Sequence, residues 1–424
     1  MENKEKILKL FEKYKVDGFL NISQTSSKSL EYSPLHKEKS FESNESSGAS
    51  LTLIKNNKKG VYKIDSYSFS KLENAFLNIL EFIDFGEFDK DIKVPEIYDE
   101  ITKDFSNIDL NDISLKDLET EADIFINYDF AKNLKIEGFS IGVSGVTNTY
   151  INSAGSFKTQ IDNSSSLFME ITGENAGVGD TNYKYISSKQ KPKVSIKDIK
   201  EIEKELIFKL KDSKTKLNPG IYDIALDRDL VIEFLDIVFS NMSNEQIRLG
   251  LSLFAKNNIG DKIFGDNFTI INNPNLENYT GNILFDKEGV TQKKTILFEK
   301  GVFKAKFYDY KNALKTSLDN LGNSQVSNIE FVGEGNSDYL KGCKILFTNL
   351  MAFHTVDEMT GKFSLLGEGY LLSDSGEKVD YIKNISLSSD IIELFSNIKS
   401  IGDDFKKDGN YKVPSLSFSN LKIV

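Results

Sequence analysis

The chain contains few of the residues on which disulfide-linked and metal-binding proteins depend. Its 424 residues include no tryptophan, one cysteine and two histidines. A disulfide framework is excluded, because it requires at least two cysteines. No hydrophobic run reaches the roughly 20 residues that a membrane-spanning helix needs. These absences indicate a globular protein with neither disulfides nor a membrane span.

Positive charge is also scarce relative to negative charge. Lysine and arginine total 53 against 64 aspartates and glutamates, which gives a net charge of −11. The lysines are spread among the acids, and this argues against a nucleic-acid partner. Residues 1–15 alternate charges with Ile7, Leu10, Phe11 and Tyr14, which predicts an amphipathic helix and not a signal peptide. We therefore expect a cytoplasmic protein that binds neither nucleic acid nor membrane.

Apolar side chains are sufficient to form real cores. Hydrophobic residues make up 39% of the chain, and 31 phenylalanines and 17 tyrosines take the place of tryptophan. A length of 424 residues suggests two or three domains. The clearest boundary is Asn218-Pro219-Gly220, where proline and glycine stop a helix and redirect the chain. We predict three parts, at residues 1–110, 111–217 and 218–424.

The first part combines strands and helices. Residues 18–25 predict a strand, and residues 50–65 predict a hairpin. Ser70 begins a capping-box pattern that opens a helix. Residues 26–50 are polar and contain few apolar side chains, which favours an exposed loop or a weak edge strand. Together these patterns indicate a small α+β unit.

The second part repeats this mixture. Ser114 and Ser195 each begin a helical pattern, and residues 136–172 between them are rich in strand-forming residues. Residues 152–155 interrupt this run with Asn-Ser-Ala-Gly, which fits a hairpin tip because Asn and Gly tolerate positive φ. Residues 174–181 (ENAGVGDT) are Gly-rich but lack the lysine and the spacing of phosphate-binding loops. A connecting loop is therefore the favoured interpretation.

The third part consists mostly of short strand patterns separated by Gly, Asn and Asp turns. A strand is expected at 221–226 and a helix at 230–239, followed by strands that favour a large mixed sheet or a barrel-like domain. The predicted fold class is therefore α+β, with two small α/β-type N-terminal sections followed by a large, mostly β C-terminal domain.

The order of several short motifs resembles that of a known family, TldD/PmbA. The matching segments are 149–157 (TYINSAGSF), 284–290 (LFDKEGV), 296–323 (ILFEKGVFKAKFYDYKNALKTSLDNLGN), 360–372 (TGKFSLLGEGYLL), 379–405 (VDYIKNISLSSDIIELFSNIKSIGDDF) and 413–424 (VPSLSFSNLKIV). Each motif is short, but the set spans most of the chain in the family's order.

The resemblance implies a zinc-peptidase architecture whose metal ligands this chain lacks. TldD-type members carry H-E-x-x-x-H on the helix after the Pro-Gly boundary and a cysteine in a later C-G-K turn. Zinc prefers such nitrogen and sulfur ligands, and a catalytic site needs three of them plus a water. The corresponding helix here retains Glu233 without any histidine, and the corresponding turn is Lys407-Asp408-Gly409-Asn410. We therefore predict no metal, no cofactor and no catalytic residue in this chain.

The remaining ligand-type side chains do not rescue such a site. His36 is far in sequence from His354 and Cys343, so no metal-ligand spacing can be built. For His354, which resembles a family position, a structural hydrogen-bonding role is favoured over a role as ligand or base. For Cys343, a small core residue is favoured over a nucleophile. A dyad of the two lacks any recognisable nucleophile motif.

Two acids, Asp286 and Glu288, form a further candidate pair. Paired carboxyls can perform acid–base work. The resemblance of their segment to the family's D-D-E-G turn instead favours a turn that shapes a cleft. Asn152, Ser153 and Phe363 are likewise interpreted as structural or interface residues.

PmbA/TldE-type members share the missing zinc ligands, and the resemblance therefore implies a partner role. We expect a non-metal subunit that pairs with a TldD-like zinc peptidase, as a homo- or heterodimer or larger assembly, to degrade or mature unfolded peptides. The alternative is a stand-alone homodimeric peptide-binding protein, because residues 26–50 depart from the family's N-terminal pattern. A third interpretation is an independent peptidase that uses other residues.

Overall fold

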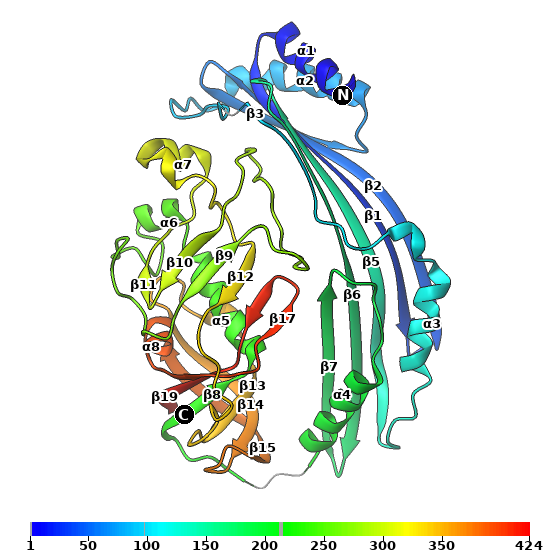
Figure 1. Cartoon of the computed structure of the whole chain (residues 1–424), viewed down its shortest axis with the longest axis vertical. Coiled ribbons are helices and arrows are strands. Elements are labelled where there is room, and N and C mark those ends of the chain that lie inside the picture. The colour runs from blue at the N-terminus through cyan, green and yellow to red at the C-terminus, as the bar shows by residue number, and fades with distance from the viewer. Residues whose placement is uncertain (1, 97, 212–214) are drawn as a thin grey trace.

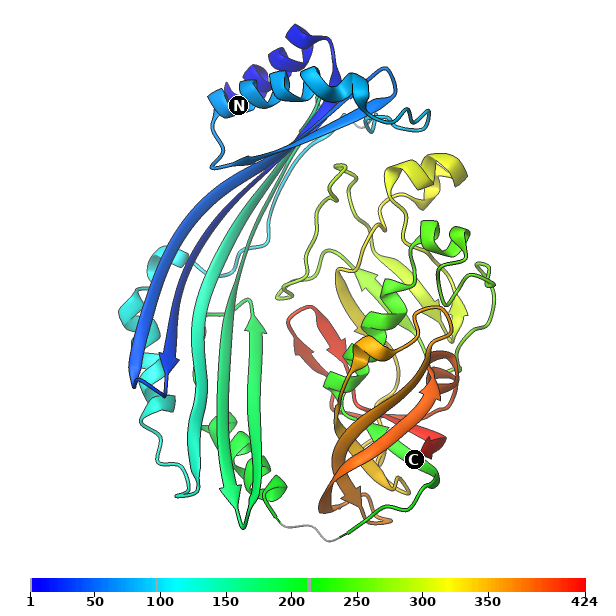
Figure 2. The same ribbon diagram turned by 180° about the vertical axis from the view of Figure 1, so that it is seen from behind.

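The computed structural model describes residues 2–96, 98–211 and 215–424. A long curved sheet forms the N-terminal half, and the C-terminal domain faces the hollow side of this sheet (Figure 1). The view from behind shows the same arrangement, with helices α1 (Glu2–Tyr14) and α2 (Phe69–Phe82) at one end of the sheet (Figure 2).

The curved sheet has seven strands in the described ranges, in the order β3-β2-β1-β5-β6-β4, with β7 paired to β6. The strands are β1 (Asp17–Ser33), β2 (Glu38–Lys55), β3 (Lys58–Asp65), β4 (Glu100–Asp104), β5 (Leu134–Asn152), β6 (Phe157–Asn175) and β7 (Val178–Ser188). All neighbours are antiparallel except β4 and β6. The hairpin predicted at 50–65 is confirmed by the pairing of β2 with β3.

Side-chain alternation gives the curved sheet an apolar face and a polar face. The apolar face buries Leu20 and Ile151 in a core shared with α1 and α2. Farther along, it buries Leu167 in a core shared with α3 (Leu115–Ile126) and α4 (Ile196–Lys209). The polar face of the sheet therefore lies on the side of the C-terminal domain.

Helix starts follow local capping chemistry. Ser114 accepts a hydrogen bond from the backbone of Asp117, whose side chain accepts one in return, and Ser195 caps α4. Both predicted caps are confirmed. The start predicted at Ser70 is wrong by two residues, because the side chain of Ser68 accepts the capping hydrogen bond of α2.

Residues 26–50, predicted as an exposed loop or a weak edge strand, are strand apart from the turn at residues 34–37. They form the second half of β1 and most of β2, in a register that pairs Ser26 with Glu45 and Leu30 with Phe41. The loop alternative is therefore wrong. Residues 38–47 of β2 pair only with β1 and are an edge strand, as the other alternative predicted, whereas the second half of β1 also pairs with β5 and lies inside the sheet. In β1, pairing on both sides satisfies the backbone hydrogen bonds of a segment whose side chains give little strand signal.

The C-terminal domain contains two six-stranded sheets in the described residues, ordered β11-β10-β9-β12-β18-β17 and β15-β14-β13-β8-β19-β16. An additional pairing of β15 with β19 closes five strands of the second sheet into a ring. The strands are β8 (Gly220–Leu226), β9 (Ile270–Asn273), β10 (Thr295–Glu299), β11 (Val302–Phe303), β12 (Asn328–Phe331), β13 (Ile345–Leu350), β14 (Lys362–Leu372), β15 (Lys378–Asp390), β16 (Ile398–Ile401), β17 (Lys406–Asp408), β18 (Tyr411–Val413) and β19 (Leu416–Ile423). The predicted α+β class with a large, barrel-like C-terminal sheet domain is confirmed.

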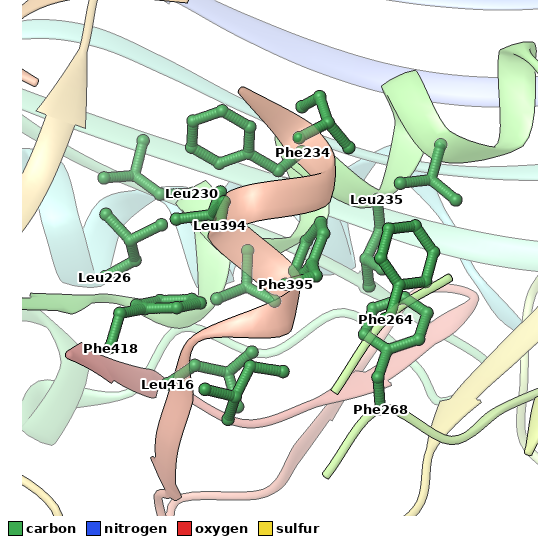
Figure 3. Close-up of a cluster of buried hydrophobic side chains, with 14 of the residues drawn as sticks. Leu226, Leu230, Phe234, Leu235, Phe264, Phe268, Leu394, Phe395, Leu416 and Phe418 are labelled. Carbon is green, nitrogen blue, oxygen red and sulfur yellow. The ribbon is translucent and has the colours of Figure 1, made fainter. Parts of the chain in front are cut away.

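The core of this domain is rich in phenylalanine. Phe234 and Leu235 of α5 (Arg228–Ser240) lie in one cluster with Leu394 and Phe395 of α8 (Ile391–Ser396) (Figure 3). Phe363 of β14 joins this cluster, with its ring centroid 5.0 Å from that of Phe234. The remaining helices are α6 (Asn244–Leu249), α7 (Tyr310–Thr316) and the short 3-10 turns η1 (Ile83–Phe85), η2 (Leu110–Asp112), η3 (Leu318–Asn320) and η4 (Phe353–Thr355).

The predicted boundary at residue 110 does not coincide with a break in the sheet. Strand β1 before it pairs with β5 after it, so one sheet crosses that position. The boundary at Asn218-Pro219-Gly220 coincides with the start of β8. The division into three domains stays a prediction. No helix within the described ranges is both long and apolar enough to cross a membrane.

Candidate functional site

The polar face of the curved sheet and the C-terminal domain enclose a cavity of about 740 Å³. Its sheet side is formed by residues of β1, β5 and β6, including Asn21, Asn148 and Gln160. Its other side includes Asn282 and Lys287 of the C-terminal domain. The two halves of the chain thus meet around a polar space and not across a continuous apolar core.

A tight turn at residues 284–290 connects the two halves. Asp286 accepts hydrogen bonds from the backbone of Glu288 and Val290, which fixes the turn. Gly289 has φ +80, and a Cβ there would lie 2.2 Å from the ring of Tyr150 on β5. Only glycine therefore allows the turn to approach the sheet this closely.

A buried lysine fastens the same turn to β6. Lys158 is fully buried, and its ammonium lies 2.9 Å from the carboxylate of Asp99. It donates to the carbonyl of Gly289 at 2.8 Å and to the hydroxyl of Thr291 at 2.7 Å. The carboxylate pairs with the ammonium charge, and the carbonyl and hydroxyl accept its hydrogen bonds. These contacts offset the free-energy cost of burying the charge.

Hydrogen bonds of a neighbouring residue on β6, Gln160, fasten the same loop. Gln160 donates to the carbonyl of Asn282 at 2.8 Å and accepts from the backbone of Leu284 at 2.7 Å. Asn21 of β1 donates to the carbonyl of Lys287 at 2.9 Å. Two strands of the curved sheet, β1 and β6, therefore hold one loop of the C-terminal domain through hydrogen bonds.

The contacts of Asp286 and Glu288 are those of a structural turn. Besides the backbone bonds of Asp286, Glu288 accepts from the backbone of Tyr310 at 2.8 Å. Burial raises the pKa of both carboxyls. One oxygen of each carboxyl thus accepts from backbone donors, which supports the turn interpretation over acid–base work.

A second cavity, also of about 740 Å³, separates β7 from α5, and we call it the β7–α5 cleft. Its walls include Tyr183, Tyr185, Glu205, Asp227, Asp229 and Tyr411. Asp227 caps α5 by accepting from the backbone of Leu230 at 3.0 Å. Desolvation raises the pKa of Asp227 to about 7. Tyr183 and Tyr185 are 64% and 54% exposed, so their rings are open to a ligand.

Helix α5 follows the Pro-Gly boundary and is the segment that, by the resemblance described above, corresponds to the family's zinc-binding helix. When Glu233 is placed on the glutamate of H-E-x-x-x-H, the two histidine positions are Ile232 and Ile237. Isoleucine offers no metal ligand. Across the ranges that the structure describes, no three His, Cys, Asp or Glu side chains are arranged to hold a metal ion.

The other sequence candidates lie in separate places. His36 lies in the turn between β1 and β2, and His354 is an exposed residue of η4. Cys343 is 2% exposed, and its thiol donates to the carbonyl of Tyr339 at 3.7 Å. Burial raises the pKa of this thiol to about 11. These surroundings are those of a core residue and not of an activated nucleophile.

The two Gly-containing turns of the N-terminal half are hairpin tips. Residues 152–155 lie between β5 and β6, where Asn152 accepts from the backbone of Ser156 and donates to the carbonyl of Pro95. Ser153 accepts from the backbone of Gly18. The predicted tip at 152–155 is confirmed. Of the Gly-rich segment at 174–181, predicted as a connecting loop, only residues 176–177 form the turn between β6 and β7, and the rest belongs to these two strands.

Sequence reasoning missed Lys158 and the tyrosines of β7. Lys158 is one of the alternating residues of a strand and carries no sequence sign of its burial. Tyr183 and Tyr185 alternate on one side of β7, which was the available signal for an exposed aromatic pair.

Comparison with known proteins assigns the C-terminal half. Residues 219–424 match the family described as PmbA/TldA metallopeptidase C-terminal domain. A metalloprotease of Methanothermobacter thermautotrophicus is 27% identical over 202 residues, 44% of this chain and 44% of the relative. A metalloprotease PmbA homologue of Buchnera aphidicola is 29% identical over 178 residues, 41% of this chain and 39% of the relative.

The structural likeness extends over the whole chain. TldE from Thermococcus kodakarensis superposes with a TM-score of 0.81 at 18% identity and covers 99% of both chains. At this identity the superposition shows the shared fold. The sequence matches to the two curated relatives span less than half of each relative's length.

Proposed function

The chain belongs to the TldD/PmbA family, and we propose that it is the PmbA/TldE-like subunit of a peptidase pair, without a metal site of its own. Its partner is a TldD-like zinc peptidase, and the pair degrades or matures unfolded peptides. The proposal includes a cytoplasmic location, no cofactor, and no nucleic-acid or membrane partner.

The observation that carries this proposal is the composition of α5. The helix is capped by Asp227 and buries its apolar side, so it remains an ordinary, well-formed element of the domain. Yet Ile232 and Ile237 stand where the family's zinc histidines stand. The domain keeps its fold, but isoleucine fills the positions of the metal ligands. This combination is consistent with selection for assembly with a partner rather than for metal chemistry.

The cavities between the two halves suit the proposed substrate. Both are large, and both are lined by polar side chains. Strand β7 pairs only with β6 among the described strands, and on its other edge the backbone of Gly409 bonds the carbonyl of Ser187. The rest of that edge can take up an extended peptide by strand addition. Such recognition uses the peptide backbone and tolerates many sequences.

The test is cleavage of an unstructured peptide by the purified chain alone, by a TldD-like protein of the same organism alone, and by the two together, with and without a chelator. Chelator-sensitive cleavage that requires the mixture, with co-elution of the two proteins in size-exclusion chromatography, supports the proposal. Cleavage by this chain alone would instead show an independent peptidase. Absence of both a complex and cleavage would favour the stand-alone homodimeric binding protein.

A further inference from the structure

We propose that the β7–α5 cleft selects basic side chains, so that the peptide segment held there is rich in lysine or arginine. This inference rests on the proposed function and names the substrate class for one of its cavities. Two walls of opposite character line the cleft, and an edge of β7 lies between them.

The first wall is aromatic. Tyr183 and Tyr185 alternate on one side of β7, and both rings are more than half exposed. The ring of Phe168 on β6 lies 6.1 Å from that of Tyr183 and extends this surface. Ammonium and guanidinium groups bind to the faces of such rings, and the attraction grows as water is excluded.

The opposite wall is acidic. Asp227 and Asp229 line it, and Glu233 and Asp236 follow Asp229 along the same side of α5, beyond the residues that line the cleft. Desolvation raises the pKa of the Tyr183 hydroxyl, and the nearby charges of Asp229, Asp227 and Glu233 raise it further. Tyr183, Asp227 and Asp229 line the same cleft, so one ligand can contact the aromatic ring and these carboxylates together.

The balance of charge in the cleft is negative. Five carboxylate residues line it against two basic residues, Lys184 and Arg228. Lys184 lies 2.8 Å from Asp198 and 2.6 Å from Glu201, and Arg228 lies 2.9 Å from Asp229. The two cations are thus engaged with acids, while Glu205 adds negative charge to the same walls, and Asp227 adds more above its pKa of about 7.

The edge of strand β7 favours a ligand in the extended conformation. Strand β7 covers residues Val178–Ser188, and β6 is its sole strand partner in the described part of the chain. At the far end of its other edge the backbone of Gly409 donates to the carbonyl of Ser187 at 3.1 Å, so the residues before Ser187 form the edge that a ligand can reach. An extended segment along the other edge would place alternate side chains toward the tyrosines and the α5 carboxylates. An acidic segment would meet like charges there, and an apolar one would leave the carboxylates desolvated without a partner.

The first test measures binding to this chain alone. A short, unstructured, fluorescein-labelled peptide of Ser, Thr and Lys residues is compared with the same peptide carrying Gln at every Lys position, by fluorescence anisotropy at low ionic strength. We expect the Lys peptide to bind about tenfold more tightly. Added salt should reduce this preference.

Variants locate the preference. D229N/E233Q and Y183S/Y185S should each reduce it to about twofold or less. D374N/E377Q removes two exposed acids elsewhere and should retain it, as should Y98S, which removes an exposed tyrosine outside the cleft. Equal reduction by the control variants would assign the effect to the net charge of the protein and overturn the proposal.

A second measurement uses the unaltered chain. Carbodiimide cross-linking joins the Lys peptide to adjacent carboxylates, and mass spectrometry identifies them. We expect cross-links at Glu205, Asp229 or Glu233, and cross-links confined to other surfaces would overturn the proposal. Equal affinity for both peptides, or no binding of either, would do the same. None of these binding results decides whether the chain is a peptidase subunit, because that function is tested separately by partner-dependent cleavage.

Discussion

The ammonium of Lys158 and the carboxylate of Asp99 lie 2.9 Å apart, and the lysine is fully buried while the aspartate is 33% exposed. The pair joins β6 to the segment before β4, and the same ammonium holds the turn of the C-terminal domain. One side chain therefore links three segments that are distant in sequence.

Removal of this lysine should be costly. K158M leaves the carbonyl of Gly289 and the hydroxyl of Thr291 without their donor, and we expect a loss of about 3–5 kcal/mol in the free energy of unfolding. Urea denaturation measures the loss. E100Q, which breaks the exposed pair of Lys4 and Glu100 on the adjoining segment, should cost less than about 1 kcal/mol. Similar losses for both variants would contradict the role of burial.

The contact of Gly289 with Tyr150 makes a second prediction. G289A places a Cβ 2.2 Å from the ring in a backbone conformation with φ +80, and should destabilise the protein by roughly 2–4 kcal/mol. G155A is the matched control, because that residue has φ +99 with nothing within 4 Å of the new Cβ. It should cost about 1 kcal/mol. Equal thermal shifts for the two variants would show that the ring contact is unimportant.

Asp227 predicts a pH dependence. Its pKa is raised to about 7 by desolvation, so the folded state binds a proton more tightly than the unfolded state does. Stability conferred by the protonated form is present in acid and is lost as the pH rises from about 4 to about 7. D227N keeps a capping side chain and removes the charge.

Near neutral and higher pH, D227N should therefore be more stable than the original chain by roughly 1–4 kcal/mol. The difference should vanish in mild acid. Urea denaturation at several pH values measures it, and D390N at the cap of α8 controls for replacing a capping aspartate. A difference that is constant with pH would refute the assignment to Asp227.

Cys343 predicts chemical inertness. With a pKa of about 11, roughly one thiol in a thousand is ionised at pH 8, and the side chain is 2% exposed. Alkylation by iodoacetamide should be slower than that of the unfolded chain by at least about 100-fold, as followed by mass spectrometry. C343A should leave partner-dependent peptide cleavage unchanged. Rapid labelling of the folded protein would revive the nucleophile interpretation.

Features that depend on residues close together in the chain, such as helix caps, could be predicted from the sequence. Ser114 and Ser195 cap their helices through side-chain bonds to residues within the first turn, so the pattern alone identifies them. The fold class follows from alternation and turn residues in the same way. The absence of metal, cofactor and catalytic residues stays a prediction.

Long-range features were not predictable. The strand at residues 26–33 is recognisable only once β5 lies beside it, about 100 residues later in the chain. Lys158 is buried only because Gly289 and Thr291 reach it from a loop of the C-terminal domain. The β7–α5 cleft likewise combines tyrosines and carboxylates from both halves, and neither set is unusual in its own segment.

The position of β1 inside the sheet also determines when this strand can complete its pairing during synthesis. Residues 17–33 leave the ribosome early, but their second partner is complete only when residue 152 has emerged. At about 5–20 residues per second, this leaves an unpaired strand edge exposed for several seconds or longer. The serine-rich, charged composition of β1 and β2, which hid the strands from sequence analysis, also makes that waiting edge a poor site for aggregation.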